Sequence, residues 1–432
     1  MKTSLILGLN ARSKLFSYPY NTVQGRKIAS SKLLSKKILK KAGIPTPEVY
    51  AKFREPRKLL EFDWQSLPSS FALKPNKGLG GEGIIVVKKK AQHPPADGLV
   101  WITTQRKRVT IEDLKLHIWD ILEGAFSLRN VPDIAFFEEY VGRHKAFRKY
   151  AYRGTPDIRV IVFNKVPVMA MLRLPTRESG GRANLHQGAI AVGIDIATGI
   201  TTKAIWHAKQ ILYKPGTKRK LRGIKIPSWD KILDIAVRCQ EVTNLGYLGV
   251  DIVYHPEKGP MVLEINSQPG LKIQLANAAG LRKRLDRVEG LTIRDAEHGV
   301  KIAKTLFASP FADRVKVEQI VKTVGIVEEI KIKSASGKKL KVAAKIDTGA
   351  WRTSIDRDLA EELGLLAEGN ILWYKRVRSA LGRERRPVID LIFWLKGRKV
   401  ETNANVSNRE KLKQKVLIGR KALKGFLVSP ER

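Results

Sequence analysis

The sequence of 432 residues contains a single cysteine, Cys239, and no apolar run long enough to cross a bilayer. One cysteine excludes a disulfide framework and any zinc or iron–sulfur site built from paired cysteines, which fits a reducing compartment. The opening apolar stretch is interrupted by Asn10 and Arg12, so we expect no export signal. These absences predict a cytoplasmic protein that does not enter a membrane.

Acidic residues are also scarce, because 41 Asp and Glu stand against 81 Lys and Arg, a net charge of +40. Such an excess favours polyanionic partners. The charge is spread along the chain, with +27 in residues 1–314 and +13 in residues 315–432, and its clusters are as short as Lys218-Arg219-Lys220. A dedicated nucleic-acid arm would be a concentrated block. We therefore expect an acidic acceptor, while nucleic acid or the ribosome stays an open alternative without a specific signal.

The length fits two or three domains, and the hydrophobic content of 43% is that of a folded chain. From residue 321 onward the pattern predicts only short strands and turns, so a boundary near 308–320 separates expected domains at 1–314 and 315–432. The clearest expected elements are helices at 31–42, 110–123, 228–243, 273–284 and 295–307, and strands at 71–74, 84–88, 134–141, 158–163, 166–174, 247–254 and 261–266.

A glycine-rich segment joins the first two predicted strands. Lys74 ends the first strand, and Gly78, Gly80, Gly81 and Gly83 follow it. Such a loop lets several backbone N–H groups approach phosphate oxygens, and a lysine at its start can reach the same charge. It is not a Walker A motif, because no Gly-Lys-Ser/Thr follows. A hairpin turn without a ligand is the competing interpretation.

Oxygen ligands follow on two later strands, at Asp251, Glu264 and Asn266. Strand periodicity puts Glu264 and Asn266 on one face, and Asp251 lies on the strand before them. Mg²⁺ prefers a few carboxylate and amide oxygens and lets phosphates complete its octahedron. A solvated polar face is the weaker interpretation, because the neighbouring residues are apolar and buried carboxylates without a cation are costly.

At these residues the chain resembles the ATP-grasp superfamily, and within it the alpha-L-glutamate ligase-like branch. The resemblance runs from about Asn10 to Phe307 and implies an α+β fold. One departure is that the N-terminal domain that usually helps to hold the substrate is reduced to a short segment. The matching motifs are Asn10-Ala11-Arg12, Ser31-Lys32-Leu33-Leu34, Ala42-Gly43-Ile44-Pro45-Thr46-Pro47-Glu48, the glycine-rich segment, Asp157-Ile158-Arg159, Asn184-Leu185-His186-Gln187-Gly188 and Leu263-Glu264-Ile265-Asn266.

The resemblance implies ATP and Mg²⁺ as cofactors and a role for each matching residue. By resemblance, ATP phosphorylates a carboxylate and an amine displaces the phosphate to leave an amide, with an amino acid and a peptide or protein acceptor as reactants. The implied roles are phosphate contacts from Lys32, Lys74 and the glycines 78–83, an adenine hinge at Glu138, Glu139, Tyr140 and Val141, charge neutralisation by Arg159 and Arg173, substrate contacts from Asn184 and His186, and two Mg²⁺ ions on Asp251, Glu264 and Asn266.

Three of these roles have alternatives. Lys32 lies in a lysine-rich helix, where a solvated side chain is the competing interpretation. For His186 the alternative is a structural histidine. Glu138 and Glu139 cannot be told apart, from sequence alone, as the residue on the adenine side.

A second motif, Asp347-Thr348-Gly349-Ala350, follows a predicted strand, and the apolar segment Val416–Arg420 comes about seventy residues later. Asp-Thr-Gly-Ala after a strand is typical of aspartic peptidases, in which two carboxylates share a proton. The domain resembles the retropepsin-like family often labelled ATP-dependent zinc protease, which implies a small all-β barrel with Asp347 as the catalytic aspartate. The zinc finds no support, because no histidine follows His298. Trp351-Arg352 fits no role that the resemblance offers.

Only one Asp-Thr-Gly occurs in the chain, so a peptidase site needs a second copy, and we expect a homodimer through this domain. A binding module without hydrolysis is the alternative. The leading interpretation of the whole chain is a ligase fused to a domain that trims or binds its product. The competing ones are a basic ribosome- or RNA-associated protein with a degenerate nucleotide site, and a protease regulated by nucleotide.

Overall fold

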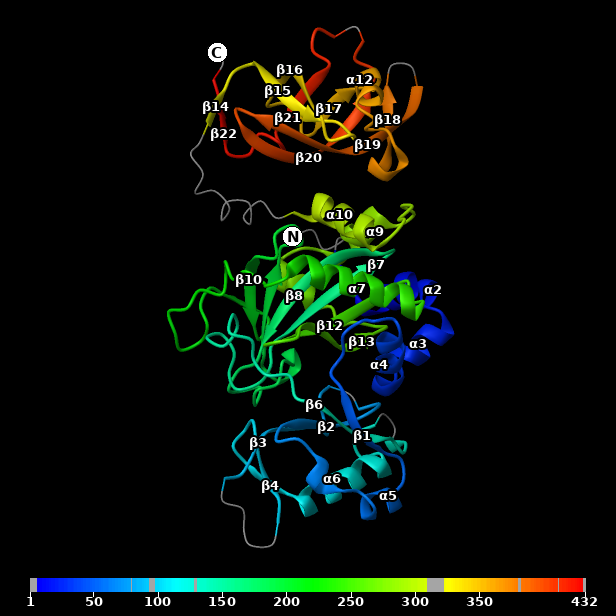
Figure 1. Ribbon diagram of the computed structural model, residues 1–432, viewed down its shortest axis with the longest axis vertical. Helices are drawn as coiled ribbons and strands as arrows, with labels where there is room; N and C mark the ends of the chain where they lie inside the picture. Colours follow the sequence, from blue (N-terminus) through cyan, green and yellow to red (C-terminus); the bar gives the residue numbers. More distant parts are fainter. Residues whose placement is uncertain are drawn as a thin grey trace. The chain divides into compact units, whose positions relative to one another are not determined.

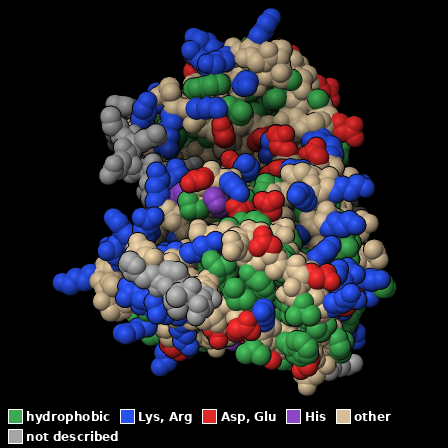
Figure 2. All heavy atoms as spheres, turned by 60° about the horizontal axis from the view of Figure 1, so that its bottom comes forward, with side chains coloured by type: hydrophobic (Ala, Val, Ile, Leu, Met, Phe, Trp, Pro, Cys, Tyr) green, Lys and Arg blue, Asp and Glu red, His purple; other side chains and the backbone are tan. Residues whose placement is uncertain are grey.

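The structure, a computed structural model, describes residues 6–78, 80–92, 98–127, 130–308, 322–379, 382–410 and 412–429, with only the backbone over 376–384. The chain divides into two compact units, residues 1–312 and 313–432 (Figure 1). Within the described ranges, no helix combines the length and the apolar character needed to cross a bilayer. Figure 2 shows basic side chains scattered over the visible face and not gathered into one block.

Short helices open the first unit: α1 (Leu9–Arg12), the π-helix η2 (Ser13–Ser17), α2 (Tyr18–Tyr20), α3 (Val23–Ala29) and α4 (Lys32–Lys41). The side chains of Thr22 and Ser31 cap α3 and α4 by accepting hydrogen bonds from backbone N–H groups three residues further on. Phe16 is buried, with its ring centroid 5.4 Å from that of Phe163. This contact fixes the N-terminal segment to the second sheet of the unit.

The first sheet is antiparallel, with the strand order β1 (Val49–Phe53), β6 (Ala135–Glu139), β2 (Phe71–Pro75), β3 (Ile85–Lys90), β4 (Val100–Thr103) and β5 (Arg108–Thr110). Helix α6 (Ile111–Glu123) begins at a capping box between Thr110 and Asp113. Together with α5 (Arg57–Leu60) and η3 (Trp64–Ser66) it covers a core in which Phe53, Phe71 and Phe137 meet edge to face.

The second sheet is antiparallel as well, in the order β11 (Lys209–Ile211), β10 (Thr201–Trp206), β9 (Ile190–Ile194), β8 (Val166–Leu174), β7 (Asp157–Phe163), β12 (Tyr247–His255) and β13 (Gly259–Asn266). Helices α7 (Trp229–Thr243) and α10 (Ala296–Phe307) pack on it, and Figure 1 shows α7 crossing its central strands. The central strands are almost wholly apolar, so the few charged residues on them are conspicuous.

The helix expected at 273–284 is wrong as a single element. The structure has two helices here, α8 (Ile273–Asn277) and α9 (Leu281–Val288), because Ala278 adopts a left-handed conformation with φ of +45°. The buried Gln274 side chain accepts a hydrogen bond from the backbone N–H group of Leu281, the first residue of α9, and one from that of Leu7 in the N-terminal segment, at 2.9 Å each.

The second unit is a closed six-stranded β-barrel. Strands β15 (Val327–Lys333), β16 (Lys339–Asp347), β21 (Val416–Gly419), β17 (Thr353–Asp356), β20 (Arg398–Ser407) and β19 (Gly382–Leu395) follow one another, and a β15–β19 pairing closes the ring. Strand β18 (Ile371–Ser379) pairs with β19 outside the ring. Further elements are β14 (Lys322–Val324), which pairs with β22 (Phe426–Val428), α12 (Arg357–Glu362) and η6 (Glu368–Asn370).

The fold class, an α+β unit followed by an all-β barrel, is confirmed, but the expectation of only short strands and turns after residue 321 is wrong. Strand β19 has 14 residues and β20 has 10. Alternation explains the length of β20, since Ala404 and Val406 face the barrel core while Asn403 and Asn405 lie on the other face. The polar residues that look like turn signals in the sequence therefore belong to a continuous strand.

Candidate active site

Two arginine–aspartate pairs lie at the centre of the second sheet. Arg159 on β7 donates to both carboxylate oxygens of Asp251 on β12, each at 2.6 Å. Arg173 on β8 donates to Asp157 at 2.5 and 2.7 Å, and its Nη2 also donates to Asp251 Oδ2 at 2.8 Å. Each pair consists of directly opposite residues on neighbouring antiparallel strands, so the strand register itself brings the charges together.

Both carboxylates are buried, with Asp251 2% and Asp157 4% exposed. Burial raises the pKa of Asp157 to about 6, although Arg173 acts against this shift. Burial acts in the same direction on Asp251, but there the charges of Arg159 and Arg173 outweigh it and hold the pKa below its ordinary value. Asp251 therefore stays ionised at neutral pH and fixes both guanidinium groups on this face of the sheet.

The other two expected metal ligands lie beside Asp251 on β13. Glu264 is its direct register partner, and Asn266 donates through Nδ2 to Asp251 Oδ2 at 3.3 Å. The Glu264 side chain is 38% exposed, with Lys32 Nζ 3.7 Å away. Two carboxylates and an amide on one face fit Mg²⁺, and the exposed Glu264 is the ligand best placed to receive it.

The described residues contain no group of three or more histidine, cysteine or acidic side chains that could hold a metal by themselves. Mg²⁺ takes few protein ligands and shares its remaining positions with phosphates and water. The set of Asp251, Glu264 and Asn266 suits such a cation.

Lys32 connects this face to the glycine-rich loop. Its Nζ donates to Gly78 O at 2.8 Å and lies within reach of Glu264, and only 13% of its side chain is exposed. Asn76, which is buried, accepts hydrogen bonds from Ser31 Oγ and from Leu33 N at 2.9 Å each, so the start of the loop is held on the first turn of α4. The Lys32 side chain is therefore not freely solvated.

The glycine-rich loop is shaped by close contacts at its two ends. A Cβ at position 78 would lie 2.3 Å from the Pro75 ring, and one at Gly83 would lie 2.5 Å from the Phe126 ring, where φ is also +65°. Between them, Gly80 and Gly81 have positive φ with space around them. The described part of the loop is thus anchored at its ends and open at its tip.

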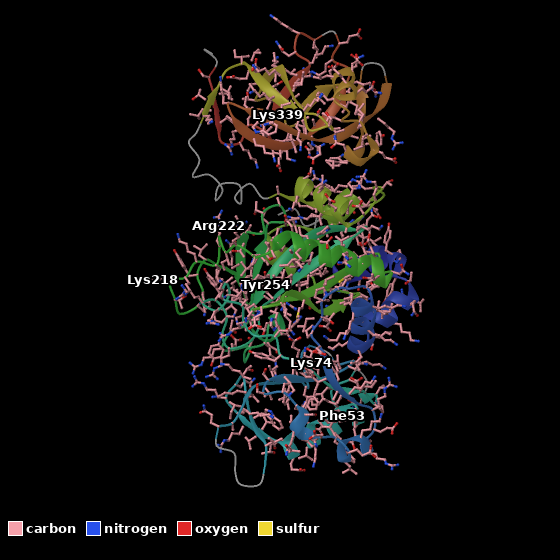
Figure 3. All side chains as sticks on the ribbon, viewed as in Figure 1. Phe53, Lys74, Lys218, Arg222, Tyr254 and Lys339 are labelled. Atoms are coloured by element: carbon pink, nitrogen blue, oxygen red, sulfur yellow. The ribbon has the colours of Figure 1, made fainter. Side chains whose placement is uncertain are left out.

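A buried charge cluster lies at the first sheet, where Lys74 on β2 and Lys36 on α4 both contact the Glu138 carboxylate on β6; Figure 3 labels Lys74. Lys36 Nζ lies 2.9 Å from Glu138 Oε2. Burial alone would raise the pKa of Glu138, but the two lysines outweigh it and hold that pKa below its usual value. For Lys36, burial wins over the attraction of Glu138 and lowers the pKa.

The two neighbouring glutamates have different environments. Glu139 lies on the opposite face of β6, where its carboxylate pairs with Lys258 and lies 3.5 Å from His255 Nε2, and it also accepts a hydrogen bond from Glu48 N at 3.3 Å. Tyr140 follows with a pKa raised by burial, and Val141 packs on Val253, Met261 and Leu263. Glu138 is therefore the glutamate on the side of Lys74.

Asn184, one of the two expected substrate residues, bonds the glycine-rich loop. Asn184 Nδ2 donates to Gly80 O at 2.5 Å, while its Oδ1 accepts from His186 N at 2.9 Å and starts the 3₁₀ turn η5 (Leu185–Gln187). The His186 side chain is exposed. Asn184 thus ties the second sheet's loops to the glycine-rich loop.

In the second unit, Asp347 ends β16 directly beside Gly419 of β21. Its Oδ1 accepts hydrogen bonds from Gly349 N at 2.8 Å and Ala350 N at 3.0 Å, so the loop curls around the carboxylate. A Cβ at Gly419 would lie 2.5 Å from the backbone of Arg352, which explains the glycine in the second segment. The two sequence segments are therefore packed against each other as the motif requires.

Trp351 and Arg352, which have no role in the sequence interpretation, make cation–π contacts. The Arg420 guanidinium lies 5.7 Å from the Trp351 ring centroid, and that of Arg352 lies 5.3 Å from the ring of Trp373 on β18. These contacts attach the Asp347 loop to its neighbours. They supply a structural reason for the bulky residues after the motif.

Sequence reasoning missed Lys36 and gave no role to Asp157. Both have a signal in the sequence: Lys36 is four residues after Lys32 and thus on the same side of α4, and Asp157 is two residues before Arg159 and thus on the same face of β7. Their partners, Glu138 and Arg173, come from distant segments, which a single sequence does not pair.

These features define the first unit as an ATP-grasp domain: lysines from a helix and a strand meet a glycine-rich loop, next to a strand pair with carboxylate and amide ligands. The family model for sugar-transfer associated ATP-grasp proteins matches residues 11–290, and the chain belongs to this family. ATP-grasp proteins typically use ATP and Mg²⁺.

Solved structures give three further similarities. The D-alanine–D-alanine ligase from Bacillus anthracis, complexed with ATP, is 18% identical with a TM-score of 0.35, over 66% of this chain and 70% of that one. The barrel resembles a Legionella pneumophila protein of unknown function (DUF785), 22% identical with a TM-score of 0.18 over 26% of this chain and 94% of that one. It also resembles simian foamy virus protease, 25% identical with a TM-score of 0.17 over 22% and 90%. Among curated proteins, a sequence search finds no match.

Proposed function

We propose that the first unit is an ATP-dependent carboxylate–amine ligase that forms an amide through an acyl phosphate. The observation that carries this proposal is the line of contacts from the arginine–aspartate network to the phosphate loop. Asp251 holds Arg159 and Arg173, its strand partner Glu264 lies 3.7 Å from Lys32, and Lys32 bonds Gly78 of the loop. The proposed metal ligands, the positively charged side chains and the glycine-rich loop thus lie next to one another.

The nucleotide would lie between the two sheets of this unit. Lys32, Lys74 and the backbone of the 78–83 loop would hold its phosphates, and the segment Glu138–Val141 would hold adenine. The buried Glu138 carboxylate, which contacts Lys36 and Lys74, would hold Lys74 in position. When bound on Asp251, Glu264 and Asn266, Mg²⁺ would screen the phosphate charge and so lower the cost of bringing a carboxylate close.

In the proposed reaction, a carboxylate oxygen of the substrate bonds the terminal phosphorus of ATP while the bond from that phosphorus to ADP breaks. An amine nitrogen then bonds the carbonyl carbon, the carbon–oxygen bond to phosphate breaks, and the nitrogen loses a proton. Arg159 and Arg173 would stabilise the negative charge that spreads over the transferring group, because their guanidinium planes are fixed by Asp251 and Asp157 before substrate arrives.

For the second unit we propose that it binds or trims the amide product, with Asp347 as its reactive carboxylate and a homodimer as the peptidase form. The curled Asp347 loop packed on Gly419 supports this role. We further propose that the amine is an amino acid, that the acceptor carries negative charge, and that the protein acts in the cytoplasm, where ATP is abundant. The net charge of +40 supports the acceptor with negative charge.

The proposal is tested by incubating the full chain with ATP, Mg²⁺ and a panel of amino acids and acids, and by measuring ADP release and product mass. Glu264→Gln keeps the side-chain shape but removes one negative charge from the metal ligands, and should lower ADP formation about 100-fold or more. Glu257→Gln, in the exposed turn between the same two strands, is the matched control and should leave the rate unchanged. Equal rates in both variants would reject the assignment.

A further inference from the structure

An open pocket with a volume of about 490 Å³ lies in the first unit, where β8 ends, β9 begins and β10 turns into β11. Its size is within the range of roughly 300–1,000 Å³ that is usual for small-molecule sites. Flat apolar groups form much of its lining, and charged groups complete it. The lining residues are Tyr152, Pro175, Thr176, Arg177, Glu178, Ile190, Trp206, Lys214 and Pro215.

The walls of this pocket are held by hydrogen bonds to one backbone carbonyl. Gly188 O accepts from Trp206 Nε1 at 2.9 Å and from Thr176 Oγ1 at 2.8 Å. The backbone N–H of Tyr152 donates to Pro175 O at 2.9 Å. The indole is therefore fixed in orientation without any ligand, which is the property of a preformed binding wall.

The charges around the pocket are mostly positive. Glu178 is already paired, because its carboxylate lies 2.9 Å from His207 Nε2. Lys214 is partly buried, and burial together with the nearby charges of Arg219 and Arg143 lowers its pKa. Like charges gathered in this way repel one another, so an anionic group placed beside Lys214 would be stabilised.

The pocket is joined to the candidate active site through the chain itself. Pro175 comes two residues after Arg173, the arginine that bridges both buried aspartates. Gly188 ends the segment that begins at Asn184, whose side chain bonds the carbonyl of Gly80 in the phosphate loop. A molecule in the pocket thus contacts the residues that follow Arg173, and it contacts Trp206 and Thr176, which bond the end of the Asn184–Gly188 segment.

We propose that this pocket binds the carboxylate substrate of the ligase, and that this substrate is a compact acid built on a ring, not an acidic peptide tail. The flat faces of Trp206 and Tyr152 suit a ring, Lys214 suits the acid, and the volume of about 490 Å³ suits a molecule of that size. The proposal rests on the proposed ligase function and specifies its substrate class.

Direct binding to the full chain without ATP tests the pocket separately from catalysis. The probes for isothermal titration calorimetry are benzoate, phenyl phosphate, inorganic phosphate and hexaglutamate, at low salt. Benzoate should bind the wild-type chain, and Lys214→Gln should weaken it about 10-fold. Lys218→Gln is the matched control and should bind like the wild type, because Lys218 is outside the pocket lining. Lys218 is exposed on the loop after β11 (Figure 3).

The other outcomes overturn the proposal. Benzoate binding that is equal in Lys214→Gln and wild type would reject the pocket, and hexaglutamate binding that is tighter and depends on Lys214 would reject a compact substrate. Binding of phenyl phosphate but not of benzoate would show that the pocket recognises a phosphate and not a carboxylate. Inorganic phosphate that binds as tightly as phenyl phosphate would show that the pocket does not recognise a ring. Glu264→Gln should retain benzoate binding. If ADP never forms although benzoate binds through Lys214, the ligase function fails while the pocket stands.

Discussion

Replacing Glu138 by glutamine should destabilise the first unit far more than the same change at its neighbour Glu139. The Glu138 carboxylate is 1% exposed and compensates two buried lysines, Lys36 and Lys74. Glutamine has the same shape, but its amide nitrogen is a donor and would face a lysine that is also a donor. Two buried cations would then lack their counter-charge.

The expected loss follows from the burial of the cluster. Breaking a buried ion pair by removing one partner costs about 3–5 kcal/mol, because the remaining charge stays desolvated. Spread over a unit of 312 residues, this corresponds to a fall in melting temperature of roughly 5–8 °C. Glu139→Gln should cost at most about 1 kcal/mol, because its partner Lys258 is 52% exposed and solvent screens that pair.

The two variants are compared by urea unfolding and thermal melts of the full chain, followed by circular dichroism. The pH dependence adds a second test. The folded pKa of Glu138 is lowered, so its contribution is present above the unfolded pKa and is lost as pH falls through the folded pKa. In Glu138→Gln the pKa of Lys36 should fall further below its ordinary value, so the deficit should shrink as pH rises toward the ordinary lysine pKa of about 10.4. Equal melting of the two glutamine variants would refute the reasoning.

Two further predictions concern the charge and the second unit. Binding of an anionic substrate, with benzoate as the probe, should weaken as salt rises from about 0.05 to 0.5 M, because the net charge of +40 acts through screened interactions. Affinity titrations at several salt concentrations measure this, and a flat profile contradicts an electrostatic role. Asp347→Asn should abolish any peptide cleavage by the full chain, and sedimentation should show a dimer whenever cleavage is seen; a monomer that still cleaves peptides contradicts a shared site.

The parts of the site that the sequence could predict are those whose partners are close along the chain. Glycine spacing indicated the loop from Gly78 to Gly83, and the alternation in Glu264-Ile265-Asn266 indicated two ligands on one face. The partner of Asp251 could not be predicted, because it depends on which strands are neighbours. Only the order β8, β7, β12 brings Arg159 from the adjacent strand and Arg173 from the strand beyond it to that carboxylate.

The choice between Glu138 and Glu139 shows a second limit. Adjacent strand residues point to opposite faces, so one of the two must face α4, but the sequence does not say which. In the structure the choice is made by two lysines on separate elements, Lys36 on α4 and Lys74 on β2. Strand periodicity predicts that the two glutamates point to opposite faces of the strand. Only the packing of α4 on the sheet shows that Glu138 is the one that faces the two lysines.

The barrel limits how a dimer of the second unit can form. The last strand, β22, pairs in parallel with β14 of the same chain, and Phe426 lies buried with the Arg398 guanidinium 5.3 Å from its ring centroid. Phe426 is therefore already used within one chain, whereas Leu427 on the same strand is 61% exposed. A second copy that packs on β22 could therefore use the exposed Leu427 as an apolar contact, whereas Phe426 is not available to it.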